Sequence, residues 1–355
     1  MDYKDKELLR SEFNLSATGI GSVPHREVKG VCDTILKLFP KMPFWPQFPK
    51  RSPYEDMNVQ FSEGLPTIYF DMEEGRLILK RHSKEDELLR FWERFLAEDL
   101  SSFLISSEYA PGLYYMVEEI KKEPDRFGPF IKGQMVGPIT FMAGVMGEEG
   151  KTILFDQELR EAITKAMALK GLWQVRKLKE TGKRIILFLD EPYLSGFGSA
   201  FVAISRDEVI DILSDIIRYI KEKEQVLVGV HCCGNTDWAM LMQTGVDIIS
   251  FDAYSYLDHF LLYKNDISNF LERGGYIAWG IVPTDKFSKG ITVFQLKKQL
   301  LGAWNRICNG NIGRIIQSSI LTPSCGLGTM KETDAILVME LLNSLPEEFL
   351  HMDLD

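Results

Sequence analysis

Three side chains able to bind a soft metal stand at the ends of apolar runs in this sequence. His231 and Cys233 close "VLVGVHCCGN", and Cys325 closes "ILTPSCGLGT". Because side chains alternate along a strand, His231 and Cys233 point to one side and Cys232 points to the other, into the wall. One imidazole and two thiolates suit Zn²⁺, and sulfur ligands argue against magnesium or calcium. A single cysteine is more often a small buried hydrophobe than a ligand, so the predicted zinc site depends on all three side chains converging.

Further polar groups follow other apolar runs. Asp190 and Glu191 come directly after "RIILFL", where we expect one of them to hold a substrate ammonium group or, alternatively, to cap the next element. Asp252 follows "DIISF" and is a candidate fourth metal ligand. The glycines of "TGIGSVPH" (18–25) leave backbone N–H groups bare, which offers a seat for a carboxylate. The alternative for these glycines is a tight turn.

The elements that must position these groups are short apolar runs, most of them followed by an amphipathic stretch. This alternation is typical of βα units around a parallel sheet. Eight such units favour a (β/α)8 barrel over an open doubly wound sheet, and barrels of this kind place catalytic groups where strands end. The predicted strands are 15–20, 42–47, 130–135, 184–190, 226–231, 247–252, 276–281 and 314–321.

The segments between the predicted strands indicate one domain, 1–355, with an insertion. The helix before the fifth strand opens on Ser205 with Glu208 three residues later, which is a capping box. After the second strand, an insertion at about 50–125 contains a hairpin that turns at Glu74-Gly75 and a helix near 85–97. Neither a domain boundary nor an internal repeat is evident, and a single barrel of this length is common.

Composition limits the partners. The chain has 41 Lys and Arg against 51 Asp and Glu, a formal net charge of −10. Without a basic patch, neither nucleic acid nor an anionic membrane surface is an expected partner. The first ten residues are charged throughout, and no run of about 18 apolar residues occurs. We therefore expect a cytoplasmic protein with reduced thiols.

Together the motifs carry a family resemblance. "IGSVPH", "GPIT", "LDEP", "HCC", "IISFD" and "PSCGLGT" occur in this order over nearly the whole chain. The ordered set resembles the catalytic C-terminal barrel of cobalamin-independent methionine synthase, within the superfamily that includes uroporphyrinogen decarboxylase and the methylcobamide:coenzyme M methyltransferases. By position, the resemblance assigns zinc to His231, Cys233 and Cys325, the homocysteine carboxylate to Ile20, Gly21 and Ser22, and the homocysteine amine to Asp190.

The sequence departs from the family pattern in two places. Asp252 stands where methionine synthase has a glutamate ligand, so the shorter carboxylate is either a weaker ligand or an outer-shell group. A second amine-binding glutamate is expected near "YEDMNVQFSEG", where the alignment leaves Glu55, Gln60 and Glu63 open.

The resemblance implies a zinc-dependent methyltransferase that activates a thiol, with homocysteine expected, as a zinc-bound thiolate. The methyl donor is either a methylfolate or a methylcorrinoid on a partner protein, because the barrel that helps hold folate in methionine synthase has no counterpart here. One alternative is a metal-free decarboxylase of the uroporphyrinogen type, which grips a polycarboxylate with arginines. Another is a non-catalytic zinc barrel that binds a corrinoid protein.

Overall fold

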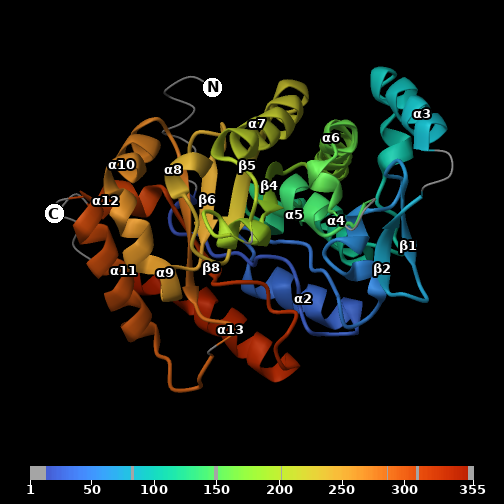
Figure 1. Cartoon of the computed structure of the whole chain (residues 1–355). Helices are drawn as coiled ribbons and strands as arrows, with labels where there is room; N and C mark the ends of the chain where they lie inside the picture. The colour runs from blue at the N-terminus through green and yellow to red at the C-terminus, as the bar shows by residue number, and fades with distance from the viewer. Residues whose placement is uncertain are drawn as a thin grey trace.

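A curled parallel sheet with helices packed on its outside forms the body of the protein (Figure 1). The computed structural model describes residues 13–80, 84–147, 151–200, 202–285, 287–308 and 312–350; the charged first ten residues lie outside these ranges. The strand order is β3-β4-β5-β6-β7-β8. The strands are β3 (Phe130–Val136), β4 (Arg184–Asp190), β5 (Val226–Cys232), β6 (Ile248–Phe251), β7 (Tyr276–Val282) and β8 (Ser319–Pro323).

The first two predicted strands are not regular strands in the structure. Segments 15–20 and 42–47 are joined to β8 and to β3 only by isolated bridges, at Ala17 and at Phe44. Pro43 and Pro46 lack the N–H that a ladder needs, which explains why the second segment cannot pair continuously. Six of the eight predicted strands are therefore found as strands in the described residues. In place of the other two the structure has three isolated parallel bridges: Ala17 with Leu321, Ser22 with Gln47, and Phe44 with Lys132.

The last predicted strand began too early in the sequence. Residues 312–317 form the helix α12 (Ile312–Gln317), and β8 starts only at Ser319. Ile315 and Ile316 are buried on this helix. A short apolar run that straddles a helix and a strand has no periodicity that separates the two.

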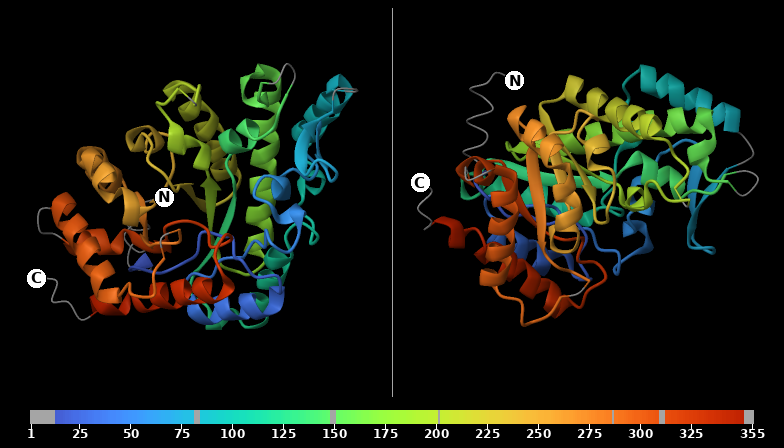
Figure 2. Two further views of the ribbon diagram at one scale, coloured as in Figure 1. Left: turned by 60° about the horizontal axis from the view of Figure 1, so that its bottom comes forward. Right: turned by 60° about the vertical axis from the view of Figure 1, so that its left-hand side comes forward.

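The helical layer confirms the predicted capping box. Ser205 Oγ accepts from the Glu208 amide, and Glu208 accepts from the Ser205 amide. Helices α2 (Val28–Leu38) and α13 (Glu332–Ser344), from opposite ends of the chain, lie side by side (Figure 2). Further α-helices are α4 (Pro111–Lys122), α5 (Pro138–Ala143), α6 (Gln157–Lys179), α7 (Arg206–Lys223), α8 (Trp238–Leu241), α9 (Ala253–Phe260), α10 (Lys264–Glu272), α11 (Val293–Cys308) and α14 (Glu347–Leu350).

The insertion contains the predicted hairpin and helix. Strands β1 (Ile68–Asp71) and β2 (Arg76–Leu79) pair antiparallel, and Gly75 turns between them with φ of 64°. Helix α3 (Lys84–Leu96) confirms the helix expected near 85–97. Helix α4 contacts α2 and α6, so this part of the predicted insertion belongs to the helical layer.

Alternation along the strands divides the core into two parts. One set of side chains packs between the sheet and the helices, for example Ile185 and Leu187 on β4. The alternate set faces inward and forms a separate cluster: Phe13, Met42, Phe130, Ile186, Phe188, Ile248, Tyr276, Ala278 and Ile320. The inward positions continue toward the carboxyl ends of the strands as Asp190, His231 and Ser250, so the same face carries the polar groups. Within the described ranges, no helix has the length and apolar character to cross a membrane.

Candidate active site

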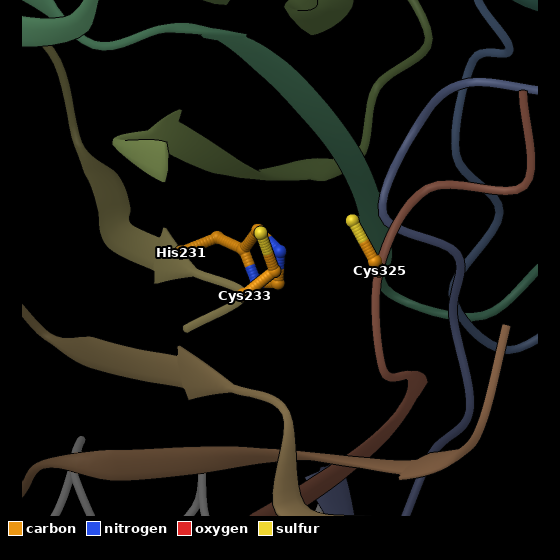
Figure 3. A group of neighbouring side chains, drawn as sticks. All are labelled: His231, Cys233 and Cys325. Atoms are coloured by element: carbon orange, nitrogen blue, oxygen red, sulfur yellow. The ribbon is translucent and has the colours of Figure 1, made fainter. Parts of the chain in front are cut away.

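His231, Cys233 and Cys325 come together at the carboxyl end of the sheet. His231 lies on β5, Cys233 follows that strand directly, and Cys325 follows β8. Figure 3 shows His231 and Cys233 side by side, with Cys325 facing them from a different segment. Their ligand atoms all lie within 4.8 Å of one another. Two thiolates on one zinc ion lie less than about 4.6 Å apart, twice a Zn–S bond, so a small contraction lets this group hold one metal ion.

A hydrogen bond holds the imidazole of His231 in an orientation suited to binding a metal ion. Its Nδ1 lies 2.9 Å from Ser250 Oγ, on the neighbouring strand β6 that pairs His231 with Ser250. Its Nε2 is buried and has no hydrogen-bond partner among the described residues. Buried polar atoms are normally paired, and a metal-binding histidine commonly uses its second nitrogen to fix the ring. The residues present therefore fit a metal ion at Nε2.

The surroundings shift the pKa values of the adjacent residues Cys232 and Cys233 in opposite directions. A hydrogen bond from the Cys325 thiol, together with the nearby His231 ring, lowers the pKa of Cys233 to about 4. The same bond and burial raise the pKa of Cys325. Burial raises the pKa of Cys232 to about 12, and that residue packs in the core as predicted. Because the thiolate is the form that binds metal, Cys233 is the better prepared of the adjacent pair.

A cavity of about 650 Å³ opens over the three residues. Its volume is in the range of small-molecule sites. Five carboxylates line it, and Lys50 is the one lysine or arginine on the wall within the described part of the chain. The residues that bear on the chemistry are His231, Cys233, Cys325, Asp190, Asp252 and Glu55.

Asp190 lies on this cavity with an open hydrogen-bonding position. It is the last residue of β4 and pairs with His231 on β5. Asp190 is 7% exposed, and its Oδ1 is buried with no partner among the described residues. Burial raises the pKa of Asp190 to about 6, and the charges of His231 and Lys132 oppose that rise. An ammonium group would supply the donor that Oδ1 lacks.

Glu191 lies elsewhere, contrary to the predicted substrate contact. It is fully buried and is not on the cavity wall. Its carboxylate accepts from the amides of Ile139 at 3.0 Å and Thr140 at 2.7 Å, and from Thr140 Oγ1 at 2.6 Å. These bonds satisfy the first amides of α5, whose N-terminus also favours a negative charge. Glu191 thus caps the helix of the "GPIT" motif.

Asp252 lies on the cavity wall but outside the group of three. It is the N-cap of α9, where Oδ1 accepts from the Ser255 amide at 2.8 Å. Burial raises the pKa of its carboxyl group. The structure does not bring Asp252 into the ligand cluster, so the outer-shell alternative fits it better than direct ligation.

The segment from Ile20 to Ser22 forms another part of the wall. Ile20 and Ser22 line the cavity, and the amides of residues 20–22 donate no hydrogen bond to any described residue. Gly21 has no positive φ, so a tight turn is not the reason for this glycine. A Cβ there would lie 2.6 Å from Gln47 Oε1. The glycine is needed for close packing, and the amides of residues 20–22 have no acceptor among the described residues.

Of the three candidates for a second amine-binding residue, Glu55 alone lines the cavity. It accepts from the Phe48 amide at 3.0 Å and from Arg51 at 2.6 Å. Burial raises the pKa of Glu55 to about 7. Gln60 is buried behind the wall, and Glu63 accepts from the Ser106 amide at 2.7 Å.

Lys132 was not identified as a site residue from the sequence, although a lysine within an apolar run is a signal of a special role. It stands at an inward position of β3, the first strand in the sheet order, and is fully buried. Its Nζ donates to Ile20 O at 2.5 Å and to Gln134 Oε1 at 3.1 Å. Burial lowers the pKa of Lys132 to about 7, and the charge of Asp190 opposes that fall. A lysine in the apolar run "FIKGQMV" is rarely buried without such partners.

No protein-family model and no curated protein matches the chain. Solved structures give weak likenesses. A B12-independent methionine synthase from Shewanella sp. W3-18-1, in complex with selenomethionine, has a TM-score of 0.46 and 19% identity over 66% of this chain and 68% of that one. A GH5-4 broad-specificity endoglucanase from Clostridium acetobutylicum has a TM-score of 0.44 and 10% identity over 96% of this chain and 100% of that one. Similarity at this level identifies no family.

Proposed function

We propose that this protein is a zinc-dependent methyltransferase that methylates a thiol, with homocysteine as the expected substrate. The observation that carries the proposal is the unpartnered, buried Nε2 of His231 beside Cys233 and Cys325, at the floor of a cavity of about 650 Å³. Three protein ligands leave one position for a substrate, which is the arrangement of catalytic rather than structural zinc sites.

The chemical difficulty is that a free thiol has a pKa of about 8.5 and is mostly protonated at neutral pH. Zinc, when bound, would keep the substrate sulfur deprotonated. His231, Cys233 and Cys325 are the proposed ligands, and Ser250 holds the imidazole in place.

The remaining polar groups would orient the substrate. In this proposal the open Oδ1 of Asp190 accepts from the amino group, and the amides of residues 20–22 bind the carboxylate. Asp252 acts from outside the ligand cluster. The methyl donor is a methylfolate or a methylcorrinoid carried by a partner protein. The cavity is several times larger than homocysteine, so a second reactant has room.

The order of the strands also supports the proposed function. We propose that the extended segments at 15–20 and 42–47 serve as the first two strands of a (β/α)8 barrel related to that of methionine synthase. Isolated bridges from this part of the chain to β8 and to β3 support the order expected of a closed ring. Closure explains why Cys325 after β8 can face His231 on β5, since these strands are not neighbours in the sheet.

The alternatives fit the cavity less well. A metal-free decarboxylase of polycarboxylates needs several cations, whereas the described wall offers Lys50 among five carboxylates. A purely structural zinc site needs four protein ligands, and the described residues supply three.

Metal analysis of the wild type and of Cys325→Ser, with thiol methylation assayed on both, tests the proposal. Methylcobalamin and methylfolate are the two donors to offer. We expect about one zinc per wild-type chain, and loss of both zinc and methylation in the variant. Full activity in metal-free protein would contradict the proposal.

A further inference from the structure

Two oxygen atoms and an aromatic ring surround the buried ammonium group of Lys132. Its Nζ donates to Ile20 O at 2.5 Å and to Gln134 Oε1 at 3.1 Å, and it lies 4.5 Å from the centroid of the Phe188 ring. Gln134 is itself oriented, because its Nε2 donates at 2.9 Å to the main-chain oxygen of Trp45, which can only accept. The acceptor that Gln134 presents to the ammonium group is therefore fixed.

Burying this charge is costly, because an ammonium group loses its water and needs compensating contacts. None of the three contacts above is with a carboxylate. Replacing a buried charged group with an apolar one of similar size is often neutral or stabilising, which indicates that Lys132 has a role besides stability. Ile20, whose oxygen it holds, lines the cavity, whereas Lys132 is not on the described wall.

The carbonyl of Ile20 and the amide of Gly21 are the two ends of one peptide unit. A hydrogen bond to the carbonyl oxygen polarises the unit and makes its N–H a stronger donor, most of all in a buried site and from a charged group. The Gly21 amide has no acceptor among the described residues. Gly21 also packs against Gln134, since a Cβ would lie 2.8 Å from its Cδ. Lys132 thus contacts both groups that set the position of this peptide.

Resting on the function proposed above, we propose that Lys132 is a positioning residue that strengthens binding of the substrate carboxylate without touching the substrate. It holds the Ile20 carbonyl from behind the cavity wall, and the polarised amide of Gly21 donates to the carboxylate. A thiol without a carboxylate gains nothing from this arrangement.

The test compares homocysteine with 3-aminopropanethiol, which has the same thiol and amino group but no carboxylate. The preference is the ratio of the two affinities, measured by calorimetry, and of the two kcat/KM values. Lys132→Met keeps the length of the side chain and removes its charge, so we expect the preference for homocysteine to fall about 10-fold, the effect of losing a hydrogen bond to a charged group. Lys132→Arg keeps the charge and the donors and should recover part of the preference.

The comparison also separates this role from an effect through Asp190. The charge of Lys132 opposes the rise in the pKa of Asp190, which is the proposed partner of the amino group. Both thiols carry that amino group, so an effect through Asp190 would weaken both equally. Equal losses for the two thiols in Lys132→Met would therefore overturn the inference.

A measurement on the wild type needs no variant to fold. The amide proton resonance of Gly21, followed in glycine-labelled protein, should move downfield when homocysteine binds and stay in place when 3-aminopropanethiol binds. An unmoved resonance with homocysteine bound would contradict the proposed contact between this amide and the carboxylate.

Lys170→Met is the matched control. Lys170 on α6 is also fully buried, and its Nζ donates to two main-chain oxygens, of Leu104 at 3.2 Å and of Phe103 at 3.5 Å. It does not line the cavity. The variant leaves these oxygens without their donor, so it should lose stability and keep the wild-type preference. An equal loss of preference in Lys170→Met and Lys132→Met would overturn the specific role of Lys132.

Binding to the purified protein separates this inference from the proposed function. If the wild type methylates neither thiol, the proposed function fails, and the binding preference still decides for or against Lys132. If the wild type methylates homocysteine but binds it no more tightly than 3-aminopropanethiol, or if Lys132→Met keeps the wild-type preference, the proposed function stands and the inference about Lys132 is wrong.

Discussion

The two ends of the inward face of the sheet are built for different purposes. At the amino end, aromatic rings fill the space: Phe13 lies 4.5 Å from both Phe130 and Tyr276, centroid to centroid. At the carboxyl end, Asp190 Oδ1 and His231 Nε2 are buried without partners in the described chain. On β4 the change occurs between Phe188 and Asp190, two residues apart. A well-packed end can hold reactive groups in place at the other end, because the same strands carry both.

Substitutions at the adjacent residues Cys232 and Cys233 should show the largest difference between packed core and reactive site. Cys233→Ser removes a proposed ligand, so we expect zinc to be lost on dialysis and thiol methylation to be abolished, with little change in stability. Cys232→Ser puts a hydroxyl into the core and should lower stability while zinc is retained. Metal analysis and chemical denaturation of both variants check this. Zinc retained in Cys233→Ser would contradict the ligand assignment.

The packed end should dominate stability. Phe130 is 1% exposed in the inner cluster, so Phe130→Ala should cost about 3–5 kcal/mol in the free energy of unfolding. Urea denaturation measures the loss. Zinc content per folded chain should stay at the wild-type level. A loss under about 1 kcal/mol would show that the rings do not support the fold.

Ser250, on the inward face of β6, makes the hydrogen bond that orients the ring of His231. Ser250→Ala removes the partner of His231 Nδ1 and should weaken zinc binding about 10- to 100-fold, as loss of an outer-shell partner does. Competition with a zinc chelator measures the affinity, and Ser250→Thr, which keeps the hydroxyl, is the matched control. Equal affinities in Ser250→Ala and the wild type would mean that the ring is held by other contacts.

A surface ion pair should matter least. Arg306 pairs with Asp258 at 2.5 Å, but their side chains are 56% and 82% exposed. Solvent screening limits such pairs, so Arg306→Ala should change the free energy of unfolding by less than about 1 kcal/mol. Thermal denaturation at low and high salt checks the effect. A larger loss in the free energy of unfolding would show that this ion pair stabilises the fold despite its exposure to solvent.

Strands buried on both faces were predictable from sequence because their apolar runs are continuous. The expected 184–190 coincides with β4, and the starts of β5 and β7 are also as predicted. The segments at 15–20 and 42–47 were predictable as extended chain but not as bridges, since pairing there depends on where prolines fall against a distant partner. The error at β8 has the same origin, because tertiary contact decides between helix and strand in a short apolar run.

The candidate site was predictable where strand parity and strand ends define it. Alternation separated Cys233 from Cys232, and parallel strand ends suggested that Cys325 would meet His231. Glu191 could not be assigned in this way, because its role depends on the amides of α5, which lies about fifty residues earlier in the chain.

X-ray absorption at the zinc edge, before and after addition of homocysteine, tests the central claim most directly. Cys233 and Cys325 would give two sulfur ligands in the resting protein, with His231 as the nitrogen ligand. We predict a third sulfur ligand, at about 2.3 Å, once homocysteine is present. A ligand set that is unchanged by homocysteine would contradict the proposal that this site activates a substrate thiol.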